Sequence, residues 1–162
     1  MWMKTKQKTG AANASWAMTI EKGDWNTGNW GMNYPGYQLG KVRFQSFEHG
    51  FLDSLTGDDV LSNGEWQWIA GVFDAKAKVW RVYVNGVMEV EEAKTRVFTP
   101  DNDPVTVASR VGSSGFFTGT LDEVLYANGP LIEDELKKHM NGTLAPVEPV
   151  GKLTTAWGNI KF

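Results

Sequence analysis

Residues 65–90, "EWQWIAGVFDAKAKVWRVYVNGVMEV", decide the fold of this chain. Apolar and polar side chains alternate in residues 65–74 and again in residues 79–86, the period-two pattern of half-buried antiparallel strands. The second run ends in Asn85-Gly86, a pair that tolerates the positive φ angles of a two-residue hairpin turn. Residues 87–93 alternate weakly and are acidic, which places the return strand near a sheet edge. The stretch therefore predicts three consecutive antiparallel strands.

The same alternation recurs along the N-terminal half of the chain. Further strands are predicted at residues 1–5, 17–23, 30–34 and 41–47. In the third of these, Trp30, Met32 and Tyr34 fall on one face, which favours packing in the core. Residues 48–65 contain turn signals and are expected to form a long loop.

The C-terminal half adds strands and then changes period. Strands are predicted at residues 104–112 and 116–129. In the following stretch Ile132, Leu136 and Met140 recur every four residues and Gly142 stands just past the end, which predicts one short amphipathic helix. Together these patterns predict an all-β protein, a two-sheet antiparallel β-sandwich of the jelly-roll type with one short C-terminal helix.

Composition narrows the classes of function. The chain has 162 residues, which suits one domain, and a formal net charge of -3 with a pI near 5.4. This charge argues against a nucleic-acid partner, which needs a basic surface. The chain has no cysteine, so a disulfide, a thiolate metal site and a cysteine nucleophile are excluded. No apolar run reaches the ~18 residues of a membrane-spanning helix, and no signal peptide is visible in this chain.

Three stretches carry a resemblance to a known family. They are "GEWQWIAGVFD", "VWRVYVNGVMEV" and "PVTVASRVGSSGFFTGTLDEVLYANGPLIEDELKKHMNG". In this order and spacing they resemble the laminin G-like jelly roll of the concanavalin A-like lectins and glucanases. The resemblance implies a domain over residues 1–145, followed by a Pro-containing tail, residues 146–162. Family members usually carry one or two strands before the one that holds Trp2, so residues 152–157 are considered as a returning strand beside a loose-tail alternative.

The resemblance also implies a function. It is typical of a non-catalytic recognition module that binds carbohydrate or acts in adhesion, outside the cell or at its surface, as part of a larger protein. Two alternatives stay open. One is a protein-interaction or structural domain, and the other is a glycoside hydrolase of the same fold. A hydrolase needs two carboxylates facing one another, and the chain has no Glu-x-Asp-x-Glu or similar run.

Aromatic rings beside turns are the candidate ligand-binding residues. Trp25 follows a predicted strand end, and Tyr37 follows the Pro35-Gly36 turn. Their polar neighbours could fix sugar hydroxyls: Asn26, Asn29 and Gln38. The alternative for the chain's many rings is burial, with Trp66, Trp68, Trp80, Phe44 and Tyr83 filling the space between two sheets.

One acidic residue is a candidate metal ligand. Jelly rolls similar to this one often hold a structural Ca²⁺, and the resemblance implies that Asp122 is a ligand, with carbonyl groups from the Lys22–Asp24 turn. The alternative is that Asp122 accepts a backbone N–H at the end of its strand.

Overall fold

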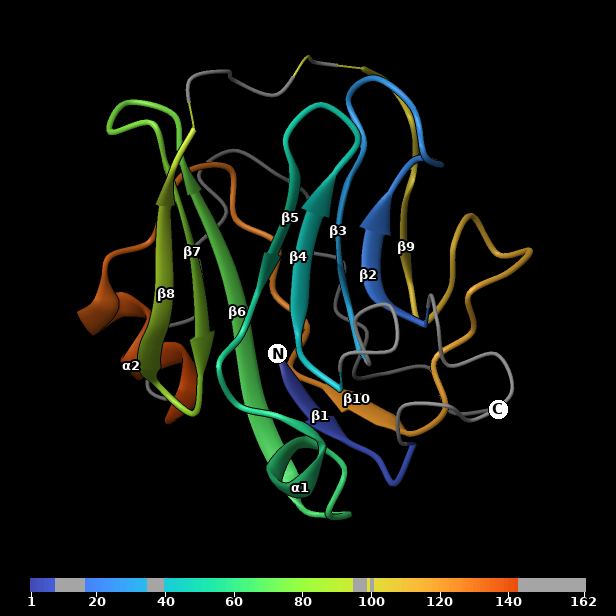
Figure 1. The fold of residues 1–162 in the computed structure, drawn as a ribbon, viewed down its shortest axis with the longest axis vertical. Coiled ribbons are helices and arrows are strands. Elements are labelled where there is room, and N and C mark those ends of the chain that lie inside the picture. Colours follow the sequence, from blue (N-terminus) through green and yellow to red (C-terminus); the bar gives the residue numbers. More distant parts are fainter. Residues whose placement is uncertain (8–16, 35–39, 95–98, 100, 143–162) are drawn as a thin grey trace, which may run out of the picture.

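The computed structural model describes residues 1–7, 17–34, 40–94, 99 and 101–142. The predicted site residues Tyr37 and Gln38, and the tail at residues 146–162, lie outside the described residues. Within these described residues, ten strands form two five-stranded antiparallel sheets that pack face to face (Figure 1). The strands are β1 (Trp2–Lys4), β2 (Met18–Lys22), β3 (Trp30–Asn33), β4 (Arg43–Ser46), β5 (Gly50–Asp53), β6 (Trp66–Asp74), β7 (Val79–Val84), β8 (Val87–Ala93), β9 (Val105–Val107) and β10 (Thr120–Asp122).

Each sheet combines strands from distant parts of the chain. Sheet A has the order β10-β1-β6-β7-β8, and sheet B has the order β5-β4-β3-β2-β9. The predicted all-β sandwich is thereby confirmed. In the part of the chain that the structure describes, two helices accompany the sheets: α1 (Asp58–Leu61) and α2 (Glu133–Met140). The second is the predicted C-terminal helix.

The hairpin predicted from residues 65–90 forms as expected. Val84 pairs with Val87 across the turn, and the two turn residues adopt φ angles of 50° at Asn85 and 78° at Gly86. The Asn85 side chain also accepts the backbone N–H of Trp68 at 2.9 Å. The turn residue therefore ties the hairpin to the neighbouring strand as well as reversing the chain. Strand β8 lies at the edge of sheet A, as its weak alternation predicted.

The buried rings divide between two cores, which corrects the prediction that they share one. Trp80 and Phe44 lie between the sheets with ring centroids 4.7 Å apart. Trp68 and Tyr83 lie on the other face of sheet A, in a smaller cluster with Leu136 of α2. Both faces of β6 and β7 are thus covered, because alternate side chains point to opposite sides of a strand. Trp66 is 39% exposed and belongs to neither core.

Three predicted boundaries differ from the structure. Residues 48–65 are more than a loop, since they contain β5 and α1. The strand predicted at residues 104–112 is limited to β9, and the one at 116–129 is limited to β10. The physical reason in the last case is pairing: β10 lies against β1, and β1 is only three residues long. The apolar residues after Asp122 have no neighbouring strand in the described part of the chain.

Candidate functional site

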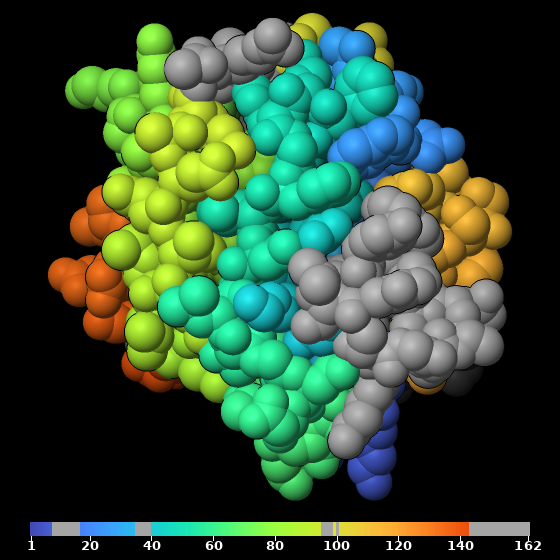
Figure 2. Space-filling model, in the orientation of Figure 1, coloured from blue at the N-terminus to red at the C-terminus, as the bar shows by residue number. Residues whose placement is uncertain are grey.

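The outer face of sheet B carries a row of polar and aromatic side chains. In strands β2, β3, β4 and β5, every second side chain points to this face. The strand register places these residues side by side across the sheet: Glu21 is opposite Gly31, Gly31 is opposite Gln45, and Gln45 is opposite Phe51. The surface over β4 and β5 occupies the centre of the view in Figure 2. The row on this face consists of Glu21, Gly31, Asn33, Arg43, Gln45, Phe51 and Asp53.

A buried hydrogen-bond network centres on Glu21. Its carboxylate is fully buried and accepts two bonds from the Arg110 guanidinium, at 3.1 and 3.0 Å. The Asn29 amide donates to the same carboxylate at 3.1 Å and to the carbonyl of Lys22 at 3.0 Å. Further along the face, Asn33 donates to Gln45 at 2.7 Å. These groups join β2, β3, β4 and the segment after β9.

Burial raises the pKa of the Glu21 carboxyl, and the two bonds from Arg110 oppose that shift. The bidentate contact is the geometry in which a guanidinium binds a carboxylate most strongly. Since the acceptor capacity of Glu21 is used by Arg110 and Asn29, this carboxylate holds the sheet together and presents no free oxygen to the surface.

An exposed aromatic cluster lies at one end of the same face and consists of Trp25, Phe47 and Phe51. Trp25 stacks on Phe51 with ring centroids 5.6 Å apart and an interplanar angle of 14°, and it meets Phe47 edge-on at 5.7 Å. Phe47 and Phe51 are 48% and 42% exposed. Exposed rings gathered in one place are candidates for contact with another molecule.

Arg43 and Asp53 border the aromatic cluster. Arg43 donates to both carboxylate oxygens of Asp53, at 2.6 and 2.8 Å. Its guanidinium carbon also lies 4.3 Å from the centroid of the Phe51 ring. The flat, apolar ring of Phe51 therefore lies next to the Arg43–Asp53 ion pair.

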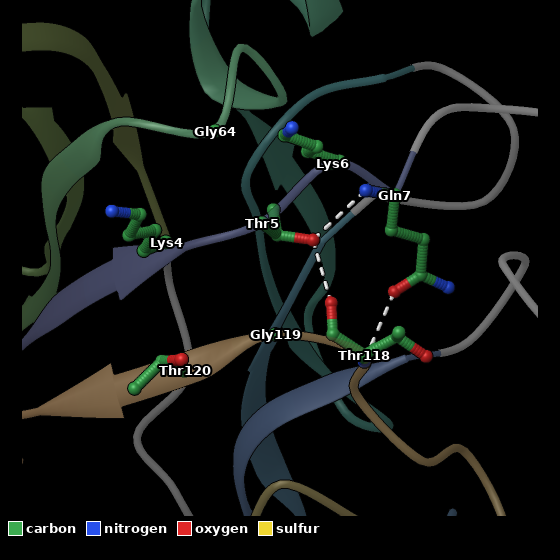
Figure 3. A pocket seen from close by; sticks show the side chains of 8 residues that line it. All are labelled: Lys4, Thr5, Lys6, Gln7, Gly64, Thr118, Gly119 and Thr120. Atoms are coloured by element: carbon green, nitrogen blue, oxygen red, sulfur yellow. Dashed lines mark hydrogen bonds between the residues drawn. The ribbon is translucent and has the colours of Figure 1, made fainter.

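A hollow opens at the end of sheet A (Figure 3). It measures about 550 Å³ and is built from the chain ends of β1 and β10 together with Gly64. Thr5 donates to the carbonyl of Thr118 at 2.6 Å, and Gln7 accepts the Thr118 N–H at 3.2 Å. Lys4 and Lys6 also line the hollow, and no ring does. It therefore offers no aromatic ring on which a sugar could stack.

A second cavity, of about 530 Å³, lies beside β6 and opens past residues 125–131. Its walls are mostly apolar and include Ile20, Met32 and Phe44 of sheet B. Trp30 lines its mouth and stacks on Tyr126 with ring centroids 5.1 Å apart. Lys22 and Asp101 form an ion pair at the same mouth.

His139 of α2 lines this cavity and should make stability depend on pH. Burial lowers the pKa of His139 below 6.5, the Met1 amine adds to this shift, and a hydrogen bond with the Glu123 backbone opposes it. When the pH falls through 6.5, the unfolded chain binds the proton first, so the free energy of unfolding decreases until the folded-state pKa is passed. Urea unfolding at several pH values between 7.5 and 5.5 measures this decrease. His139→Gln should remove it, and an unchanged pH profile in that variant would show that His139 is not the cause.

The sequence comparison agrees with this architecture. A family model described as the concanavalin A-like lectin/glucanases superfamily matches residues 1–137. The chain belongs to this superfamily. Membership supports a carbohydrate-binding or related module in general and specifies no ligand. A search of the curated proteins gave no match. Among the described residues, no helix has the length and apolar character needed to cross a membrane.

The structure places the predicted site residues of this lectin-like domain in different surroundings. Trp25 is half-buried in the aromatic cluster, and Asn26 beside it is exposed. Asn29 is fully buried, and its amide is bound to Glu21 and to the Lys22 carbonyl. Asn29 therefore supports the loop that carries Trp25 instead of meeting a ligand at the surface.

The sequence reasoning missed Phe47 and Phe51. Phe51 fell within the residues expected to be a loop, so nothing in the pattern placed it opposite Gln45 on the outer face. The signal that could have found it is the alternation of Phe51 with Leu52, which is 5% exposed and packs in the core of the superfamily domain.

Asp122, the candidate calcium ligand, lies exposed at the end of β10. Its carboxylate accepts the backbone N–H of Glu123 at 2.7 Å. Asp122 belongs to sheet A, whereas the Lys22–Asp24 turn follows β2 of sheet B. Within residues 1–7, 17–34, 40–94 and 101–142, no three His, Cys, Asp or Glu side chains gather as a metal-binding group.

Proposed function

We propose that this domain is a non-catalytic recognition module that binds carbohydrate on the outer face of sheet B. The observation that carries the proposal is the aromatic cluster of Trp25, Phe47 and Phe51, with the exposed Asn26 and the half-buried Asp53 beside it. Sugars present C–H groups on the faces of their rings and hydroxyls at their edges, so they pair with an aromatic surface that is bordered by polar groups. Superfamily membership supports the same ligand class.

Two carboxylates on this face support recognition without catalysis. Glycoside hydrolysis requires an acid and a base or nucleophile that are free to exchange protons or attack. Glu21 is held by Arg110 and Asp53 is held by Arg43, each through two hydrogen bonds. The oxygens of both carboxylates are therefore engaged by an arginine, which leaves them less able to transfer a proton or attack a sugar.

The superfamily also suggests a setting for this function. A domain that binds glycans through a surface patch suits the cell surface or the space outside the cell, as part of a larger protein. The carbohydrate would be free or attached to a glycoprotein. Ring stacking does not require calcium, and a structural Ca²⁺ held by Asp122 would be an addition to this mode of binding.

Trp25→Ala is expected to weaken glycan binding at least about tenfold, equivalent to about 1.4 kcal/mol. The reason is the loss of the largest ring of the aromatic cluster. The measurement is a glycan array with the purified domain, in Ca²⁺ and in a chelator, followed by calorimetric titration of the best glycan. Trp25→Phe should keep part of the affinity because it keeps a ring.

Trp66→Ala is the matched control, since Trp66 is also partly exposed but lies on sheet A. It should leave glycan affinity unchanged. Trp25→Ala should lower the free energy of unfolding by about 1 kcal/mol, the size of an aromatic pair contact. An array without any bound glycan, or equal losses in both variants, would contradict the proposal. That result would favour the alternative of a protein-interaction or structural domain.

A further inference from the structure

We propose that the hollow at the end of sheet A is a binding site for a phosphate monoester, such as the phosphate group of a phosphorylated sugar. Its walls are the end of β1, the start of β10 and Gly64, which comes shortly before β6 (Figure 3). This site is separate from the glycan-binding face, because the three strands beside it belong to sheet A and the aromatic cluster lies on sheet B.

Lys4 and Lys6 project from the same side of the chain into the hollow. Burial alternates here, since Thr5 and Gln7 are buried whereas the two lysines are exposed. Side chains two positions apart on an extended chain lie on one face, about 6.5 Å from one another. The Thr5 hydroxyl donates to the carbonyl of Thr118, and the Gln7 side chain accepts the Thr118 N–H. These bonds fix the segment that carries the lysines (Figure 3).

Two threonine hydroxyls lie beside the lysines, on the neighbouring segment. Thr120 pairs with Lys4 between β10 and β1, and the continuation of this antiparallel register brings Thr118 next to Lys6. Opposite residues of an antiparallel pair point to the same face, with Cβ atoms about 5 Å apart. Both threonines are exposed, and neither hydroxyl has a hydrogen-bond partner among the described residues. Two donors therefore stand next to two ammonium groups.

Glycine at two positions shapes the hollow. A Cβ atom at Gly64 would lie 2.8 Å from Cε of Lys6, so the missing side chain leaves room for this lysine. A Cβ atom at Gly119 would lie 2.5 Å from the carbonyl oxygen of Lys4, so the missing side chain lets the two segments approach closely. The two glycines thus determine where the ammonium groups emerge.

Positive charge is concentrated in the hollow. None of its lining residues is acidic, and no ion pair joins Lys4 or Lys6 to a carboxylate in the part of the chain that the structure describes. The sequence that follows directly, residues 8–16, adds Lys8 and no acidic residue, although the whole chain has a net charge of -3. Two neighbouring ammonium groups repel one another, and an anion bound between them offsets that repulsion.

A phosphate monoester matches this set of groups. At pH 7 it carries a charge of about −1.5 to −2 and three strong acceptor oxygens, which suits two ammonium groups and two hydroxyls. The hollow measures about 550 Å³, so an organic group attached to the phosphate fits as well. The lysine stems and threonine methyl groups offer C–H surface to that group. A sulfate ester or a carboxylate carries one charge only and matches the two lysines less well.

The first test compares ligands by calorimetric titration of the full chain at low ionic strength. Glucose 6-phosphate should bind more tightly than glucose 6-sulfate, and glucose should not bind in the hollow. The affinity for glucose 6-phosphate should rise between pH 5.5 and 7.5, because the phosphate loses its second proton near pH 6. No histidine, aspartate or glutamate lines the hollow, so this pH dependence comes from the ligand. Equal affinity for the sulfate, or an affinity independent of pH, would overturn the assignment to phosphate.

Two further probes identify what carries the phosphate. They are inorganic phosphate and vesicles that contain phosphatidic acid. Binding of the vesicles would support a lipid headgroup as the source, and binding of glucose 6-phosphate or inorganic phosphate without the vesicles would support a soluble ligand. If none of these phosphates bound, the hollow would not be an anion site.

The second test changes the lysines. Lys4→Gln and Lys6→Gln should each weaken binding of glucose 6-phosphate at least about tenfold, since each removes a charged hydrogen-bond donor. Lys6→Arg should retain most of the affinity because it retains the charge. Lys76→Gln is the matched control, since it removes the same charge from an exposed lysine between β6 and β7. Losses as large in Lys76→Gln would indicate an effect of net charge and would overturn the site.

NMR spectroscopy locates the bound ligand. Glucose 6-phosphate should shift the backbone amide signals of Lys6, Gly64 and Thr118 and leave the signal of Phe51 unchanged. Shifts confined to the aromatic cluster would overturn the site in the hollow. Trp25→Ala should bind glucose 6-phosphate as the original chain does, so either proposal can fail without the other.

Discussion

Trp80→Ala is expected to lower the free energy of unfolding by about 4 kcal/mol. Trp80 is fully buried between the sheets and packs against Phe44 of sheet B at 4.7 Å and against Phe73 at 6.1 Å. Removing the indole leaves a cavity where both sheets meet, and these rings cannot close it without shifting the backbone. Urea and thermal unfolding measure the loss, which corresponds to a fall in melting temperature of about 10 °C for a domain of this size.

Two further variants test whether the loss of stability in Trp80→Ala comes from the loss of core packing. Trp80→Phe keeps a ring in the core and should cost about 1.5 kcal/mol. Trp66→Ala removes the same side chain from a partly exposed position and should change the free energy of unfolding by about 0.5 kcal/mol or less. If Trp80→Ala were no worse than Trp66→Ala, Trp80 would not be the centre of the main core.

Glu21→Ala is expected to lower the free energy of unfolding by about 3 kcal/mol. The substitution removes the carboxylate that Arg110 and Asn29 both bind, and it leaves the Arg110 guanidinium largely buried, at 16% exposure, with its main partner lost. Because Asn29 anchors the loop that carries Trp25, glycan affinity should fall as well. Unfolding in urea and calorimetric glycan titration measure the two effects.

Glu21→Gln is the matched control, because it keeps the size of the side chain and an acceptor oxygen. It should cost less stability than Glu21→Ala. Combining Glu21→Ala with Arg110→Met gives a double-mutant cycle, in which the double variant should be more stable than the sum of the single losses predicts. Additive losses would mean that Glu21 and Arg110 contribute independently.

Much of the fold could be predicted from alternation and turn residues. The hairpin at Asn85-Gly86 and the amphipathic helix are local features, and each formed as the sequence indicated. The division of rings between two cores could not be predicted, because alternation separates Trp68 from Ile69 without saying which side faces the second sheet. That choice is made by α2, which covers the Trp68 side.

Only the local part of the candidate site could be predicted from the sequence. Trp25 stood out because it follows a strand end among turn residues. Its neighbours Phe47 and Phe51 reach it through the pairing of β4 with β5, which joins residues that the sequence alone does not align. Asn29 was predicted to lie at the surface, but its amide is buried because it donates a hydrogen bond to the buried Glu21 carboxylate.

The position of β1 between β10 and β6 has a consequence for synthesis. Strand β1 is made before the other described strands, but its neighbour β10 is separated from it by more than a hundred residues, since Trp2 pairs with Asp122. Sheet A therefore cannot be completed while the chain is still growing through β6, β7 and β8. Such distant pairing slows folding and leaves strand edges open meanwhile. Chaperones that hold apolar strands during translation should consequently increase the yield of this domain more than that of a helical protein of equal length.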